Sequence, residues 1–137
     1  MGYWDSKGGR SYHHTAPVNA MYALHESLLI LKEEGLEKAW ARHAKMSKML
    51  ADGFEALGIK YLVEEKYRLP QLNTIIIPDH IIDEAAIRAK LLNDHGLEIG
   101  AGLGTLAGKV WRVGLMGHSA SKENIEKCLT AFKAVMN

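Results

Sequence analysis

The amino-acid sequence predicts an α+β fold, in which a small mixed or antiparallel sheet of about four strands carries helices on one face. A long, bent pair of helices is expected to precede the sheet. Three observations lead to this prediction. Apolar residues recur every three or four positions from Val18 to Leu57, β-branched runs such as Asn73–Ile77 are typical of strands, and the glycine-dense segment Gly100–Gly108 joins two consecutive strands.

The chain begins with a segment that shows no period. Residues 1–16 mix glycine, serine, histidine and aromatic residues, so we expect an irregular arm there and a single α+β domain over residues 17–137. The first helix should run from Pro17, at the first helical position, to Gly35, with Thr15 as the candidate N-cap.

A second helix is expected from Leu36 to Leu57, because its apolar residues form one broad face, and Gly58 should end it. Beyond Gly58 the pattern alternates between strands and helices. Strands are predicted at Ile59–Val63, Asn73–Ile77, Leu97–Ile99 and Val110–Leu115, and helices should begin at Asp83, ending at His95–Gly96, and at Ser121.

Composition excludes several classes of protein. The chain has 137 residues, a net charge of +1 and a single cysteine, Cys128, so it fits neither a disulfide scaffold nor a cysteine-rich zinc site. Its lysines and arginines form no basic stripe, which argues against nucleic acid. Its apolar runs fall short of the roughly 18 residues of a membrane span, and its start does not resemble a signal peptide. We therefore expect a cytoplasmic protein.

Arg112 is the first candidate for a functional side chain. Strand alternation places Trp111 and Val113 on one face and Val110, Arg112 and Gly114 on the other. A planar guanidinium beside a glycine suits a carboxylate held by two hydrogen bonds. Spacing alone favours a simpler alternative, in which Arg112 lies on an edge strand and pairs with a nearby acid such as Glu98.

Two further motifs have a structural and a functional interpretation. The glycines of Gly100–Gly108 superficially resemble a phosphate loop, but the segment leads into a strand rather than a helix, so a tight β connection is favoured. The motif Tyr12-His13-His14-Thr15 precedes a helix start and could bind an anion, but taken alone it is better explained by capping by Thr15 and by solvated histidines. No metal site and no hydrolase triad can be recognised from spacing.

Five segments occur in the order and spacing of a known family. They are Tyr12–Pro17, Glu33–Glu37, Arg68–Pro70, Gly100–Gly104 and Gly108–Leu115. Over essentially its whole length the chain resembles the C-terminal part of the class V aminotransferases, of the alanine–glyoxylate and serine–glyoxylate type. These are pyridoxal-phosphate enzymes of fold type I and usually homodimers.

The resemblance implies roles for individual residues. Arg112 matches the arginine that binds the α-carboxylate of amino-acid and 2-oxo-acid substrates, which reverses the preference drawn from spacing. Tyr12 and Thr15 match residues that reach the cofactor phosphate of the neighbouring subunit. Trp4 lies in the approach to the same pocket, and His13 and His14 are expected to do positioning work only.

The family's cofactor lysine and pyridine-binding aspartate lie upstream of the Tyr12–Thr15 motif, in a large domain. None of the twelve lysines here stands in a segment like that of the cofactor lysine, so the resemblance assigns no catalytic residue to this chain and predicts that it is inactive alone. The expected partners are that large domain and a second subunit. The alternative is a non-catalytic, stand-alone binding or dimerisation module derived from this domain.

Overall fold

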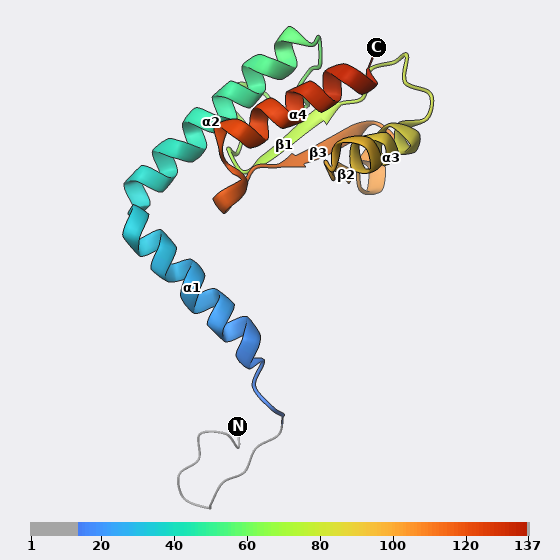
Figure 1. The fold of residues 1–137 in the computed structure, drawn as a ribbon. Helices are drawn as coiled ribbons and strands as arrows, with labels where there is room; N and C mark the ends of the chain where they lie inside the picture. The colour runs from blue at the N-terminus through green and yellow to red at the C-terminus, as the bar shows by residue number, and fades with distance from the viewer. Residues whose placement is uncertain (1–13, 137) are drawn as a thin grey trace, which may run out of the picture. The chain divides into compact units, whose positions relative to one another are not determined.

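The computed structural model describes residues 14–136 and contains four α-helices and three strands within them (Figure 1). In chain order these are α1 (Val18–Glu34), α2 (Leu36–Ala56), β1 (Leu72–Ile76), α3 (Glu84–His95), β2 (Gly100–Ala101), β3 (Val110–Gly114) and α4 (Lys122–Val135). Single 3-10 turns lie at Glu65–Tyr67, Gly104–Leu106 and Gly117–Ser119. The chain divides into two compact units, residues 1–39 and 40–137, with the boundary inside α2.

Helix α1 follows the predicted bounds but not the predicted cap. Pro17 occupies the N-cap position without a side-chain hydrogen bond, so the expectation that Thr15 caps the helix is wrong. At the other end, Gly35 has a φ of 85°, a conformation that a residue with a Cβ adopts only under strain, and its N–H bonds to the Leu31 carbonyl. None of the side chains of α1 is buried.

The sheet is purely antiparallel and has the order β1-β3-β2. It contains three strands rather than about four among the described residues. The predicted strand Ile59–Val63 contributes only an isolated bridge from Tyr61 to Ile75, and the predicted strand Leu97–Ile99 ends just before β2. Both segments have strand-like side chains. The first meets β1 only around Tyr61, and the second forms no ladder pair with a described strand, which side-chain propensity does not reveal.

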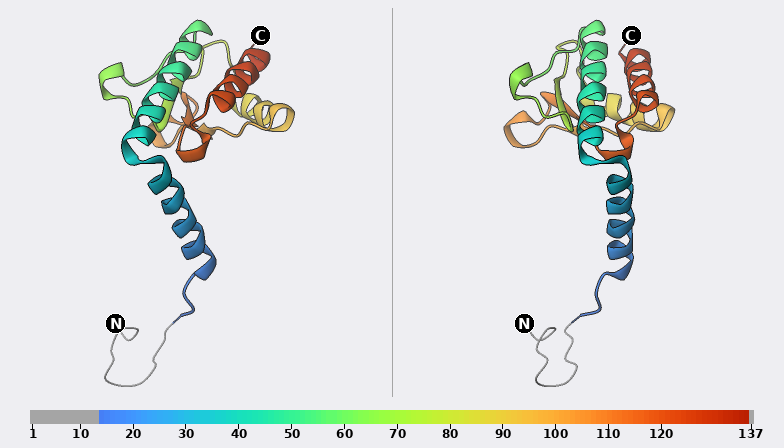
Figure 2. Two further views of the ribbon diagram at one scale, coloured as in Figure 1. Left: turned by 60° about the vertical axis from the view of Figure 1, so that its left-hand side comes forward. Right: turned by 90° about the vertical axis from the view of Figure 1, so that its left-hand side faces the viewer.

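Three helices cover one face of the sheet. In the views of Figures 1 and 2, α2 and α4 run side by side over this face, with α3 beside α4. The predicted helix starts are confirmed, since the Asp83 side chain accepts from Ala86 N–H at 2.9 Å and the Ser121 hydroxyl accepts from Asn124 N–H at 3.2 Å. Gly96 ends α3 in the left-handed conformation, as expected.

The core lies between these helices and the sheet, and its largest members are aromatic. Phe132 of α4 makes edge contacts with Phe54 of α2 and with Trp111 of β3, at centroid distances of 5.0 and 5.9 Å. Leu129 of α4 packs against Gly53, where α2 has no side chain to keep the helices apart. The core therefore fixes α2 and α4 directly behind β3.

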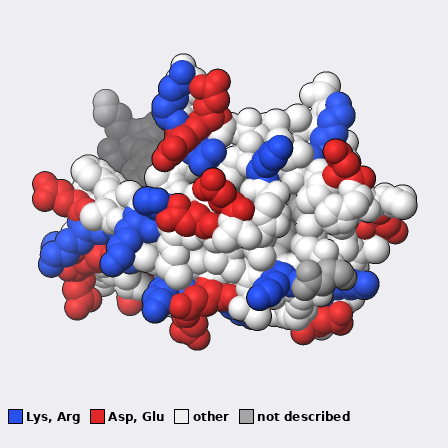
Figure 3. Space-filling model, turned by 90° about the horizontal axis from the view of Figure 1, so that it is seen from above, with Lys and Arg blue, Asp and Glu red and all other residues white. Residues whose placement is uncertain are grey.

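The surface carries both signs of charge. On the face drawn in Figure 3, lysine and arginine side chains are interspersed with aspartate and glutamate, so that face should produce no strong field of one sign. Among the described residues no helix is long and apolar enough to cross a bilayer. The same residues include no group of three or more His, Cys, Asp or Glu side chains placed to hold a metal ion.

Candidate functional site

The side of the sheet that faces away from the three helices is called here the outer face. Register and alternation place these residues on it: Leu72, Thr74 and Ile76 of β1, Gly100 of β2, and Val110, Arg112 and Gly114 of β3. Burial confirms the predicted alternation along β3, since Trp111 and Val113 are buried in the core while Arg112 is half-buried and Gly114 exposed. Most of the outer face is thus apolar or glycine, with one cation in the middle.

Arg112 lies at the centre of the outer face, because β3 is the central strand of the sheet. Its Nε donates a hydrogen bond of 2.8 Å to the carbonyl of Ala101. Its guanidinium lies over Gly100, where a Cβ would be only 3.3 Å from Nη2 and 3.5 Å from Cζ. The backbone of β2 thereby holds Nε, and the two terminal nitrogens make no hydrogen bond to another described residue that would occupy them.

The alternative role predicted for Arg112 does not match the structure. Arg112 lies on a central strand rather than an edge strand, and within the described residues no carboxylate, including that of Glu98, comes within 4.0 Å to form an ion pair with it. Because Nε is already used, a bound carboxylate would be held end-on by the two terminal nitrogens. A guanidinium with free terminal nitrogens is chemically suited to a carboxylate, and this role of Arg112 stays a prediction.

Glu84, a residue that sequence reasoning missed, ties β3 to α3 behind the outer face. Its carboxylate accepts from Arg88 at 2.8 and 3.0 Å and from the indole N–H of Trp111 at 3.0 Å. The hydrogen bonds from Arg88, and secondarily that from Trp111, lower the pKa of Glu84 despite partial desolvation. An acid in the first turn of α3 with an arginine four residues later was the available signal.

The glycine-dense loop is a tight β connection, as predicted. A Cβ at Gly102 would collide with the carbonyl of Leu106, and the Gly102 N–H bonds to the carbonyl of Val110 at 2.9 Å. The loop folds back on itself and helps to bury Val110, the one fully buried member of the outer face. It leads into β3 and not into a helix, so it lacks the geometry of a nucleotide loop.

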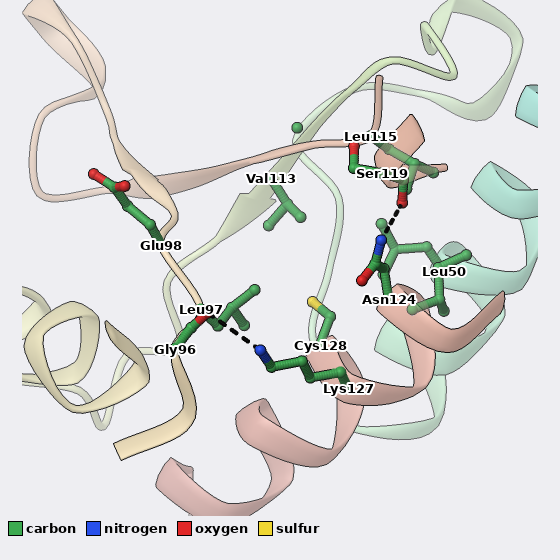
Figure 4. A pocket seen from close by; sticks show the side chains of 12 residues that line it. Leu50, Gly96, Leu97, Glu98, Val113, Leu115, Ser119, Asn124, Lys127 and Cys128 are labelled. Carbon is green, nitrogen blue, oxygen red and sulfur yellow. Dashed lines mark hydrogen bonds between the residues drawn. The ribbon is translucent and has the colours of Figure 1, made fainter. Parts of the chain in front are cut away.

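A pocket of about 240 Å³ lies at the end of β3, beside α4 and the segment after α3 (Figure 4). Its walls include Val113, Leu115 and the thiol of Cys128, and Lys127 bridges its rim to the carbonyl of Gly96 at 3.4 Å. Burial raises the pKa of Cys128 to about 12, so the thiol is a poor nucleophile. Arg112 does not line this pocket.

The remaining predicted site residues belong to the N-terminal part of the chain. Tyr12, Trp4 and His13 lie outside the described residues. Thr15 and His14 are exposed in the segment before α1, which belongs to the other compact unit. Thr15 and Arg112 thus stand in separate units, and their assignment to one site stays a prediction.

Comparison with known proteins gives consistent relatives, although no family model matches the chain. The chain is 37% identical over 134 residues to an (S)-ureidoglycine–glyoxylate transaminase of Bacillus subtilis and 38% identical over 128 residues to the alanine–glyoxylate aminotransferase of Oryctolagus cuniculus. These matches include 98% and 93% of this chain but only 32% of each relative.

Among solved structures, the chain is 47% identical to an alanine–glyoxylate aminotransferase from Nostoc sp., with a TM-score of 0.89 over 98% of this chain and 35% of that one. The fold of this chain is therefore similar to that of the matching third of these aminotransferases. Within that class its relatives are the alanine–glyoxylate and ureidoglycine–glyoxylate enzymes, and the chain is consistent with the C-terminal part of a class V aminotransferase, about one third of the relatives' length.

Proposed function

We propose that this chain is the C-terminal α+β domain of a pyridoxal-phosphate-dependent aminotransferase that moves an amino group from alanine, serine or a similar donor to glyoxylate or a similar 2-oxo acid. The observation that carries the proposal is Arg112, whose guanidinium lies over Gly100 and is held there by the hydrogen bond from Nε to the Ala101 carbonyl. Among the described residues it has no acidic partner.

Arg112 would bind the one group that every amino-acid and 2-oxo-acid substrate shares, the carboxylate next to the reacting carbon. Two parallel N–H···O hydrogen bonds from a guanidinium fix both the position and the plane of that carboxylate. Holding it reduces the rotational freedom of the substrate, which is the positioning that a two-substrate reaction requires. The hydrogen bond from Nε to Ala101 keeps the guanidinium in place before the substrate arrives.

The described residues do not by themselves form a cradle for pyridoxal phosphate, so no step of the reaction is derived through it. The pocket of Figure 4 is lined by polar and apolar side chains in similar measure and does not contain Arg112. When bound, the cofactor supplies the electron sink of transamination. Thr15, with its exposed hydroxyl just before α1, is the described residue assigned here to the cofactor phosphate, and Tyr12 is assigned with it.

Partners are part of the proposal. Helix α1 exposes a row of large apolar side chains, of which Met21, Tyr22 and Leu24 are each more than half exposed. Contiguous apolar surface of this kind indicates an interaction site. We assign it to the large cofactor-binding domain and to the second subunit of a homodimer. A cytoplasmic location is retained as well and rests on the use of one buried, free cysteine.

A graft tests this function. The segment of the Nostoc sp. alanine–glyoxylate aminotransferase that this chain matches is replaced by this chain, and transamination from alanine to glyoxylate is measured beside the unaltered enzyme. We expect the graft to retain the cofactor and to transaminate. A folded graft that retains the cofactor but does not transaminate, while the unaltered enzyme does, contradicts the proposal and favours the non-catalytic module.

A further inference from the structure

We propose that Met116 is a specificity-determining residue, which forms an apolar wall beside the carboxylate-binding Arg112 and restricts the enzyme to substrates with small side chains. This inference rests on the proposed function. A clamp from α2, made by Arg42 and His43, holds the turn that carries Met116. Neither the wall nor the clamp was recognised from the sequence.

Met116 follows β3 and folds back over it on the outer face. Its terminal methyl, Cε, lies 3.2 Å from the position that a Cβ on Gly114 would occupy, so the absence of a side chain at Gly114 makes room for it. Gly114 and Arg112 are two residues apart on the same face, a separation of roughly 6.5 Å along the strand. Leu72, 43% exposed, is the cross-strand partner of Gly114. Met116 and Leu72 thus bound the outer face next to Arg112.

The backbone of Met116 is held at both of its polar groups by one side chain. The Ser119 hydroxyl accepts a hydrogen bond from Met116 N–H at 3.1 Å and donates one to the Met116 carbonyl at 2.7 Å. The Ser119 carbonyl in turn accepts from the side-chain amide of Asn124 at 3.2 Å, which connects the turn to α4 (Figure 4). These hydrogen bonds restrict the backbone of Met116, so its Cα stays in one position.

Two neighbouring residues of α2 clamp the same turn from the other side. Nη1 of Arg42 donates to the carbonyls of Gly117 and Ala120, at 2.9 and 3.0 Å. Nε2 of His43 accepts from Gly117 N–H at 3.0 Å. Gly117 has a φ of 54°, in the left-handed region. Both polar groups of Gly117 are therefore held by α2, whose own position is set by the core.

The consequence concerns which substrates fit. A substrate whose carboxylate binds the terminal nitrogens of Arg112 has its side chain close to Met116. The backbone turn that carries Met116 is held by hydrogen bonds and cannot move aside. Glyoxylate has no side chain and alanine has one carbon, so both avoid the wall, whereas a three-carbon chain meets it. A difference of one or two methylenes in an apolar pocket typically changes kcat/KM by about 10- to 200-fold.

The test uses the active graft described above and compares kcat/KM for 2-oxopentanoate with kcat/KM for glyoxylate. We expect Met116→Ala to raise this ratio at least tenfold, and Met116→Leu to leave it within about threefold, because leucine restores most of the volume. Arg42→Gln should raise the ratio in the same direction, because it loosens the turn without removing the wall. Leu92→Ala, on an exposed position of α3 behind the sheet, is the matched control and should not change it.

The outcomes separate the two proposals. An unchanged ratio in Met116→Ala, with native kcat/KM for glyoxylate, overturns the role of Met116 and leaves the proposed function intact. An equal fall in kcat/KM for both acids in Met116→Ala assigns the residue to folding and also overturns it. An inactive parent graft overturns the proposed function and this inference with it.

Discussion

Replacement of Arg112 by lysine keeps the positive charge but removes the geometry that the structure gives to it. A guanidinium presents two terminal nitrogens in one plane, while the Nε–H···O bond to Ala101 holds that plane over Gly100. Lysine has one nitrogen, so it can either approach the Ala101 carbonyl or meet a substrate carboxylate, and it forms no parallel pair. The substitution should therefore be far from conservative.

The magnitude follows from what is lost. Removing a hydrogen-bonded charged partner from a bound carboxylate costs about 2–5 kcal/mol, or roughly 30-fold to several thousand-fold in kcat/KM. The loss should be similar for every amino-acid and 2-oxo-acid substrate, since all carry this carboxylate. Steady-state kinetics of both half-reactions in the graft measure it, and absorbance of the bound cofactor checks that retention is unchanged.

Two results would refute this reasoning about Arg112. Near-native kcat/KM in Arg112→Lys would mean that a point charge suffices, and the carboxylate role would be wrong. A loss confined to one substrate would assign Arg112 to a side chain rather than to the shared carboxylate. Tyr12→Phe and Thr15→Ala should show the opposite pattern, with weaker cofactor retention and a milder effect on substrate discrimination.

Three further expectations follow from contacts in the domain. Gly100→Ala is compatible with the backbone, but its methyl would displace the guanidinium of Arg112, so kcat/KM should fall about tenfold with unchanged cofactor retention; native kinetics would contradict this. Glu84→Gln should destabilise the chain by about 1 kcal/mol at pH 7. Because the pKa of Glu84 is lowered in the folded state, its contribution to the free energy of unfolding is present above the unfolded pKa of about 4.3 and is lost as pH falls through the folded value. The difference in stability between the two chains, measured by urea unfolding, should therefore be smaller at pH 3 than at pH 7. A difference that does not depend on pH would assign the effect to packing. Cys128, buried and with a pKa raised to about 12, should not react with a thiol reagent at pH 8 until the chain unfolds, and rapid reaction of the folded chain would show that the core opens.

Local signals predicted most of the elements. The caps Asp83 and Ser121 and the stop at Gly96 were recognised because each acts on neighbouring backbone groups within a few residues. The strand Ile59–Val63 was overpredicted for the opposite reason, since a strand exists only where a second strand meets it. Side-chain preference cannot show that Tyr61 alone reaches Ile75.

The sequence by itself determined the α+β class, the face of β3 that carries Arg112 and the resemblance to part of the aminotransferases. These depend on the periodicity of apolar residues, on short-range hydrogen bonds and on the order of motifs, all of which can be read from the sequence without the tertiary structure. Only the tertiary structure decided that β3 is central and that Gly100 lies beneath the guanidinium.

The clamp on the turn after β3 was equally hidden in the sequence. Arg42 and Gly117 are 75 positions apart, and no local pattern connects them. Their contact exists because the aromatic core packs α2 behind β3, which brings one end of the helix to the turn. Long-range packing, and not local preference, therefore fixed the turn that carries Met116.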